Sequence, residues 1–107
     1  MESNRELLEY AAKAAGNGAN SWSNSHKCLF TTHGPYPNEY RKWNPLTDDG
    51  DALRLATHCE IAVKFTAIRV IAKWVNIRCQ ERYLTDRNAA TRRAIVRAAA
   101  EIGKTMP

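Results

Sequence analysis

Alanine is the residue that most limits how this chain can fold. The sequence has 107 residues, of which 16 are Ala, whereas Leu, Ile, Val and Phe together number only 19. A chain of this length usually forms one domain and buries roughly 60–65% of the surface of its extended form. The core must therefore be thin and rich in Ala, which excludes a two-domain enzyme with a large cleft. We expect residues 1–107 to form a single domain.

The N-terminal segment has a strong helical signal. Ser3 and Glu6 have the spacing of a capping box. In this motif the side chain of each residue accepts a hydrogen bond from the backbone nitrogen of the other at the start of a helix. Apolar residues follow at helical spacing as far as Ala15, and Gly16 is suited to the left-handed residue that ends a helix. The sequence therefore predicts a helix over residues 4–15.

Two later segments also predict helices. Thr47 or Asp48 can cap a helix over about residues 49–58, whose first turn holds further carboxylates that complement the helix dipole. A run of capping residues precedes Ala and Ile at three- and four-residue intervals over about residues 88–102. We expect this last helix to end at Gly103.

Most of the remaining segments predict short strands. Residues 27–32 and 40–43 have the composition of short strands, and apolar and polar residues alternate over 60–66, which is typical of a strand. Residues 16–26 are polar, and we expect a loop there that Trp22 anchors to the core.

Residues 68–82 allow two interpretations. Strands over 68–74 and 75–82 are favoured because Val, Ile and Trp fit a pleated surface. A helix is the alternative, with an apolar face made by Ile68, Ile71, Ala72 and Val75. With strands, the fold class is α+β: a small, mainly antiparallel sheet with packed N-terminal, central and C-terminal helices, in an α–β–α sandwich-like arrangement.

The sequence has no signal for a membrane or an oxidising compartment. No apolar run approaches the roughly 18 residues that span a membrane, and the first residues lack the features of a secretory signal. Cys28, Cys59 and Cys79 match neither a disulfide framework nor the paired spacing of a zinc site. We expect a cytoplasmic protein with reduced thiols, no membrane partner, no metal and no cofactor.

Two clusters of reactive residues are candidates for a metal or catalytic site. Asp48, Asp49 and Asp51 could bind a cation, but their positions fit helix capping better than a calcium loop. His58 and Cys59 are neighbours near a helix end, where adjacent side chains point in different directions, and no third group orients them. We therefore expect no catalytic residues and no enzymatic activity.

Positive charge is concentrated in the second half of the chain. Residues 1–60 hold six basic and eight acidic side chains, whereas residues 61–107 hold ten basic and three acidic ones. Such an asymmetry is typical of nucleic-acid contact. The candidate binding residues are Arg78, Arg82, Arg92, Arg93 and Arg97. The alternative is a solvated helix face that pairs with carboxylates of the N-terminal helix.

A second candidate surface is aromatic. Tyr36, Tyr40 and Trp43 lie in or beside a proline-bearing segment, residues 33–43, and Trp, Tyr and Arg are enriched in protein interfaces. The segment is therefore a candidate partner-binding loop. Equally, these rings could cover one face of a small sheet that has few large aliphatic residues.

Three segments of the chain resemble a known group of proteins. They are the runs Leu7–Gly16, Trp43–Ala56 and Ala90–Gly103, and together they cover somewhat under half of the chain. They resemble small phage and prophage proteins that carry the phage ABA sandwich domain. The resemblance implies an α–β–α sandwich and a phage or prophage origin in a bacterial host cell, but it implies no reaction.

The preferred prediction is a non-catalytic phage accessory protein that binds a host or phage protein. The resemblance implies this class, because small phage proteins often inhibit or redirect a host protein, including components of antiviral defence. The alternative is a nucleic-acid-binding protein that uses the Arg-rich C-terminal half. A homodimer is compatible with both, since dimerisation would add buried area to a thin core.

Overall fold

The computed structural model describes residues 2–16, 18–31 and 41–107. Its elements, in chain order, are α1 (Asn4–Ala15), β1 (Ala19–Ser23), β2 (Cys28–Thr31), β3 (Arg41–Trp43), α2 (Asp49–Cys59), β4 (Ala62–Phe65), β5 (Arg69–Trp74), β6 (Ile77–Arg82) and α3 (Arg87–Thr105). Within the described residues the structure therefore has three helices and six strands.

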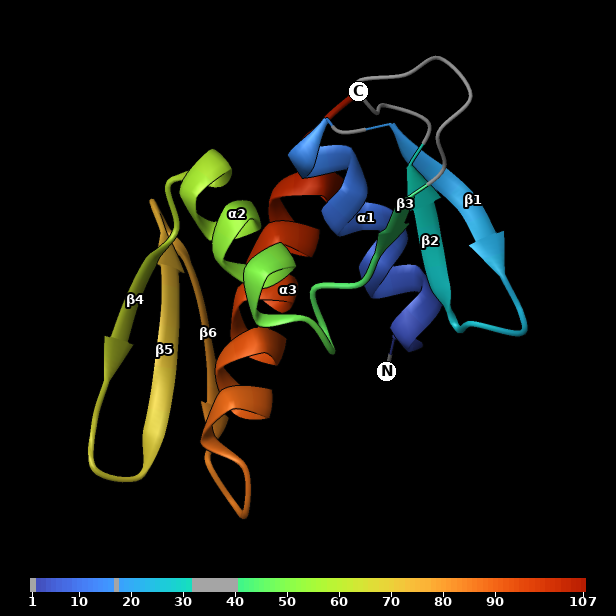
Figure 1. Cartoon of the computed structure of the whole chain (residues 1–107). Coiled ribbons are helices and arrows are strands. Elements are labelled where there is room, and N and C mark those ends of the chain that lie inside the picture. The colour runs from blue at the N-terminus through green and yellow to red at the C-terminus, as the bar shows by residue number, and fades with distance from the viewer. Residues whose placement is uncertain (1, 17, 32–40) are drawn as a thin grey trace.

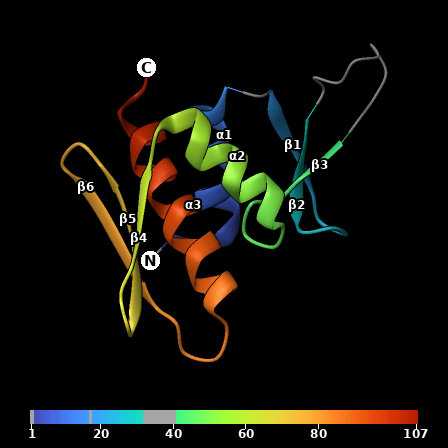
Figure 2. The same cartoon turned by 60° about the vertical axis from the view of Figure 1, so that its left-hand side comes forward.

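The strands form two antiparallel sheets, one with the order β1-β2-β3 and the other with the order β4-β5-β6. The helices lie between the two sheets (Figures 1 and 2). Helix α1 packs on β1 and β2, α3 packs on β5 and β6, and α3 also packs against α1 and α2. The expected α+β class, with helices packed on antiparallel strands, is confirmed. The sequence predicted one sheet in an α–β–α sandwich-like arrangement, whereas the strands form two sheets with the helices between them.

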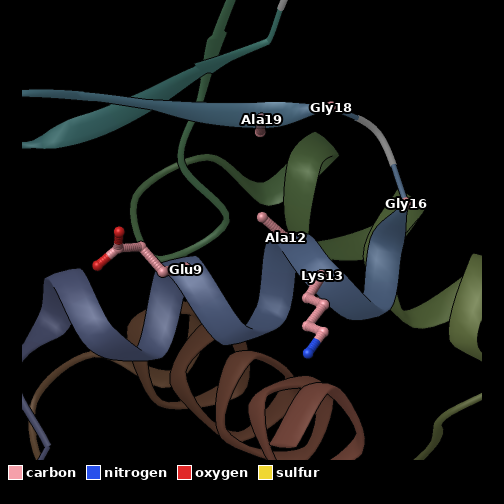
Figure 3. A pocket seen from close by; sticks show the side chains of 6 residues that line it. All are labelled: Glu9, Ala12, Lys13, Gly16, Gly18 and Ala19. Carbon is pink, nitrogen blue, oxygen red and sulfur yellow. The ribbon is translucent and has the colours of Figure 1, made fainter. Parts of the chain in front are cut away.

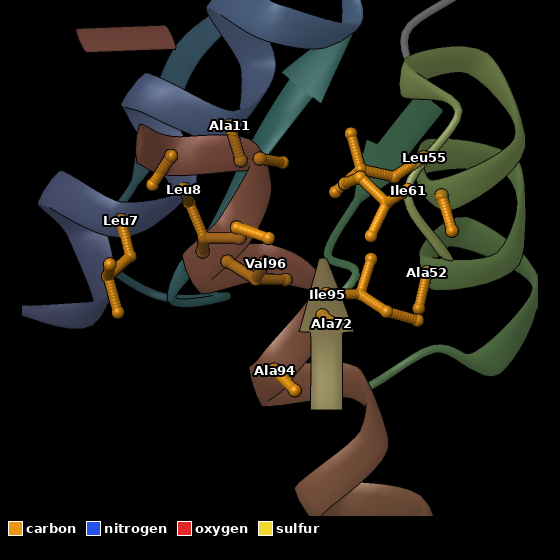
Figure 4. Packing of buried hydrophobic residues seen from close by; sticks show 14 of the residues in the cluster. Leu7, Leu8, Ala11, Ala52, Leu55, Ile61, Ala72, Ala94, Ile95 and Val96 are labelled. Carbon is orange, nitrogen blue, oxygen red and sulfur yellow. The ribbon is translucent and has the colours of Figure 1, made fainter. Parts of the chain in front are cut away.

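The core is built mainly where the helices meet. Figure 4 shows Leu8 of α1, Val96 of α3 and Leu55 of α2 among the buried side chains of this region. Most of the other buried positions on the three helices are Ala, as the composition requires. Small side chains let the helices approach closely, so a thin core still fills the space between them.

The predicted helices are confirmed, with one correction at the end of α3. Ser3 makes the expected capping box, and Asp48 and Asp86 accept hydrogen bonds at the starts of α2 and α3. The prediction that Gly103 ends the last helix is wrong, because the helix continues to Thr105. A Cβ at position 103 would lie 2.0 Å from the backbone carbonyl oxygen of Tyr10. Glycine is therefore required there by the close approach of α1.

The strand predictions are also confirmed, again with one correction. Residues 68–82 form the β5–β6 hairpin, so the helical alternative is wrong. The loop expected over 16–26 is wrong in part, because residues 19–23 form strand β1 and pair with β2. Among the described side chains of β1, Ala19 is buried and Trp22 packs partly buried against the core, so this edge strand needs few apolar residues.

None of the described helices is both long and apolar enough to cross a lipid bilayer.

Candidate functional site

The β4–β6 sheet has one face on the helices and one face outside. Val70 and Ala72 of β5 are completely buried, so they point toward α3. Because side chains alternate along a strand, Arg69, Ile71 and Lys73 lie on the opposite face. No other described helix or strand covers that face (Figures 1 and 2). We call it the outer face.

The register of the sheet extends the outer face to the neighbouring strands. In β6, Arg82 lies opposite Arg69, Gln80 opposite Ile71, and Arg78 opposite Lys73. In β4, Lys64 lies opposite Ile71 on its other side, and Ala62 lies opposite Lys73. The outer face consists of Ala62, Lys64, Arg69, Ile71, Lys73, Arg78, Gln80 and Arg82.

The outer face carries five cations and no carboxylate. In the described part of the chain, none of these five side chains takes part in an ion pair. The one acidic residue of β6, Glu81, lies opposite Val70 and therefore points to the helix side. The guanidinium of Arg69 donates a hydrogen bond to the Oε1 atom of Gln80 at 3.0 Å, which orders the side chain without neutralising it.

Two pairs of like charges lie directly across the β5–β6 ladder. Arg69 faces Arg82, and Lys73 faces Arg78. Like charges at directly opposite positions destabilise an antiparallel sheet. Between these pairs, Ile71 is only 8% exposed although it is outside the core cluster, because the long side chains around it cover it. The outer face is thus a crowded cationic surface whose charges are not balanced by nearby carboxylates.

The arginines of α3 have a different environment. Arg92 donates to the carbonyl oxygen of Leu46 at 2.8 Å and to Asp49 at 2.6 Å, and its side chain is only 16% exposed. Its contacts tie α3 to the segment that leads into α2.

The other two candidate arginines on α3, Arg93 and Arg97, share one carboxylate. Arg93 donates to the side chain of Asn4 at 3.2 Å and forms an ion pair with Glu81, and Arg97 binds both Glu81 and the carbonyl oxygen of Gln80. The candidates on α3 therefore hold the fold together, through partners other than the N-terminal carboxylates that the sequence suggested. Of the five predicted arginines, Arg78 and Arg82 are the ones that the structure brings together on the outer face.

The aromatic candidates do not form a described surface. Tyr36 and Tyr40 lie outside the described residues. Trp43, at the end of β3, is 7% exposed and belongs to the core. Its ring therefore packs inside the molecule and is not part of an exposed partner-binding loop.

Three residues of the outer face, Lys64, Arg69 and Lys73, were not among the predicted binding residues. The signals that could have found them are the alternation over residues 60–66, which includes Lys64, and the alternation over residues 69–73, which places Arg69 and Lys73 on one side with Ile71. Their grouping with Arg78 and Arg82 depends on the hairpin register.

The reactive side chains are positioned as structural groups. Burial raises the pKa of Cys28, Cys59 and Cys79, which keeps these thiols protonated and weakly nucleophilic. His58, beside Cys59, is exposed at the end of α2.

The three Asp residues near the start of α2 have structural partners. Asp48 caps the helix, Asp49 pairs with Arg92, and Asp51 accepts from the backbone nitrogen of Asn44 at 3.0 Å and from Arg54 at 2.7 Å. Among the described residues, no group of His, Cys, Asp and Glu has the arrangement of a metal site.

A hollow of about 410 Å³ lies between α1 and β1 (Figure 3). Its two ionisable side chains, Glu9 and Lys13, point away from each other. Glu9 accepts from Arg5 at 3.3 Å, and Lys13 donates to the carbonyl oxygen of Met106 at 2.9 Å. The hollow therefore has no acid–base pair, and the outer face is the strongest candidate site.

Comparisons with known proteins do not identify the chain: no family model, no curated protein and no solved structure matches it.

Proposed function

We propose that this chain is a non-catalytic protein that binds nucleic acid on the outer face of the β4–β6 sheet. The observation that carries the proposal is the two pairs of like charges at opposite positions of the ladder, Arg69 with Arg82 and Lys73 with Arg78, on a face without carboxylates. Such contacts cost folding stability, and a bound polyanion would remove that cost.

The chemistry of the outer face suits phosphate. Three of its five cations are Arg, whose planar guanidinium can bind phosphate oxygens in a bidentate manner. Phosphate contacts supply most of the affinity of sequence-independent binding, and they release counterions from the nucleic acid. A row of Lys and Arg on one exposed face is the electrostatic footprint of this mode of binding.

The competing proposal is a protein partner: the chain would act as an accessory protein of the phage group that it resembles and would bind a host or phage protein. Of the aromatic residues that suggested such a partner, Trp43 is buried, and Tyr36 and Tyr40 lie outside the described residues. The outer face supports nucleic acid more directly, because its cations are regularly spaced and mostly exposed, and within the described residues none of them forms an ion pair. An acidic protein that binds this face while nucleic acid does not would favour the competing proposal.

The test is a fluorescence anisotropy titration of labelled nucleic acid at increasing salt. Five phosphate contacts predict a slope of log affinity against log salt of about −4.5, or a loss of about 500-fold between about 50 mM and about 200 mM salt. Arg78→Gln with Arg82→Gln removes two contacts and should reduce the slope to about −2.7 and the loss to about 40-fold.

The matched control is Arg41→Gln with Lys42→Gln. These residues are exposed on β3 of the other sheet, and their replacement lowers the net charge by the same amount. The control should bind with an unchanged slope. Absence of binding at about 50 mM salt would contradict the proposal. An equal loss in both double variants would also contradict it, because net charge rather than the outer face would then control binding.

A further inference from the structure

We infer that the nucleic acid is B-form double-stranded DNA, held by its two phosphate backbones across the major groove. The inference rests on the proposed function and adds the kind of strand and the way the sheet lies on it. Three features of the outer face carry it: the residue types, the spacing of the charges, and the neutral row between them.

The outer face has no aromatic side chain. Proteins that bind single strands combine a cationic groove with aromatic rings on which bases stack, and sheets that bind single-stranded RNA present such rings on the exposed face. Here the aromatic residues of the strands, Phe65 and Trp74, lie at positions opposite Val70 and Ile77 on the helix side. The outer face can therefore hold phosphates but offers no platform for unpaired bases.

The charges fall in two rows that cross the strands. One row is Arg69 with Arg82, and the other is Lys73 with Arg78, four residues away on each strand. At about 3.4 Å per residue the rows are about 14 Å apart. The major groove of B-form DNA is about 12 Å wide, so each row can reach one of the backbones that border it. The major groove of duplex RNA is deep and narrow, so it does not admit the sheet in this way.

A mostly neutral row lies between the two charged rows. It consists of Ile71 and Gln80, with Lys64 at the β4 edge. Ile71 and Gln80 would face the base edges in the groove, and Lys64 at the edge would supply the fifth phosphate contact. The Oε1 atom of Gln80 already accepts a hydrogen bond from Arg69, which limits what Gln80 can read. We therefore expect binding that depends little on the base sequence.

The test compares three probes by fluorescence anisotropy: a short DNA duplex, one of its single strands, and an RNA duplex of the same sequence. The DNA duplex should bind at least about tenfold more tightly than either other probe at equal salt. Two double variants, Arg69→Gln with Arg82→Gln and Lys73→Gln with Arg78→Gln, each remove one row. Each should reduce the slope by about 1.8, since a duplex phosphate contact contributes about 0.9.

The outcomes separate this inference from the proposed function. Equal or tighter binding of the single strand, or of the RNA duplex, would overturn the inference while leaving nucleic-acid binding intact. A change in slope in one row variant but not in the other would overturn the bridging geometry. Failure to bind any of the three probes would contradict the proposed function and the inference together. Circular dichroism of each variant shows that a lost interaction is not a lost fold.

Discussion

The three candidate arginines of helix α3 and the cations of the outer face belong to the same basic half of the chain, yet they have opposite surroundings. Arg92, Arg93 and Arg97 all have carboxylate or carbonyl partners inside the molecule. Arg69 and Arg82 instead face each other across a ladder, as do Lys73 and Arg78. Positive charge thus has two roles here. On α3 it connects structural elements through internal partners, and on the sheet it is grouped on one face without carboxylates.

Net charge alone therefore does not locate a binding surface. Residues 61–107 carry an excess of seven positive charges, but some of these cations form ion pairs with Asp49 and Glu81. The position of each cation relative to its nearest carboxylate decides whether an external anion can use it. Three variants test this comparison.

The largest effect on stability is expected at Arg92. Arg92→Met keeps most of the apolar stem but removes the hydrogen bonds to Leu46 and Asp49. Hydrogen bonds to charged groups contribute about 1.5–3 kcal/mol, and the free energy of unfolding should fall by about this amount in urea titrations. DNA binding should keep its salt slope. A reduced slope in folded Arg92→Met would show that α3 also contacts the ligand.

A smaller effect is expected when the carboxylate shared on the α3 side is removed. Glu81→Gln leaves Arg93 and Arg97 without their common anionic partner. Because these groups are partly exposed, the free energy of unfolding should fall by only about 1 kcal/mol. DNA affinity should rise slightly, since a negative charge near the outer face is lost. Lower affinity in Glu81→Gln would mean that the paired arginines must stay in place for binding.

Local sequence signals predicted the helices well but could not predict what their side chains meet. Caps and apolar periodicity located α1, α2 and α3, because these signals depend on residues within one or two turns. The role of Gly103 depends on the backbone of Tyr10, which is remote in sequence. The acceptor of Arg92, the carbonyl of Leu46, is also remote. Such contacts exist only once the helices have packed.

The outer face was partly predictable. Alternation in residues 69–73 separates its cations from the buried Val70 and Ala72 once a strand is assumed. The pairing of Arg69 with Arg82 requires a two-residue turn at Val75 and Asn76, and the sequence has no common hairpin signal there. Val75 has a φ of 51°, which β-branched residues rarely adopt. The register of the hairpin, and with it the like-charged pairs, could therefore not be predicted from the sequence.

The smallest expected effect has the opposite sign and is the sharpest test of the comparison. Arg82→Gln removes the like charge opposite Arg69, so the sheet should become more stable by about 0.2–1 kcal/mol. The same change should weaken DNA binding, so that stability and binding move in opposite directions. Urea unfolding at low and high salt measures this increase in the free energy of unfolding, which should become smaller at high salt because salt screens the repulsion. Arg41→Gln is the control, since Arg41 lies opposite the uncharged Thr31. If Arg82→Gln lowered stability, Arg82 would be a structural residue like Arg92, and the distinction between the two groups of cations would fail.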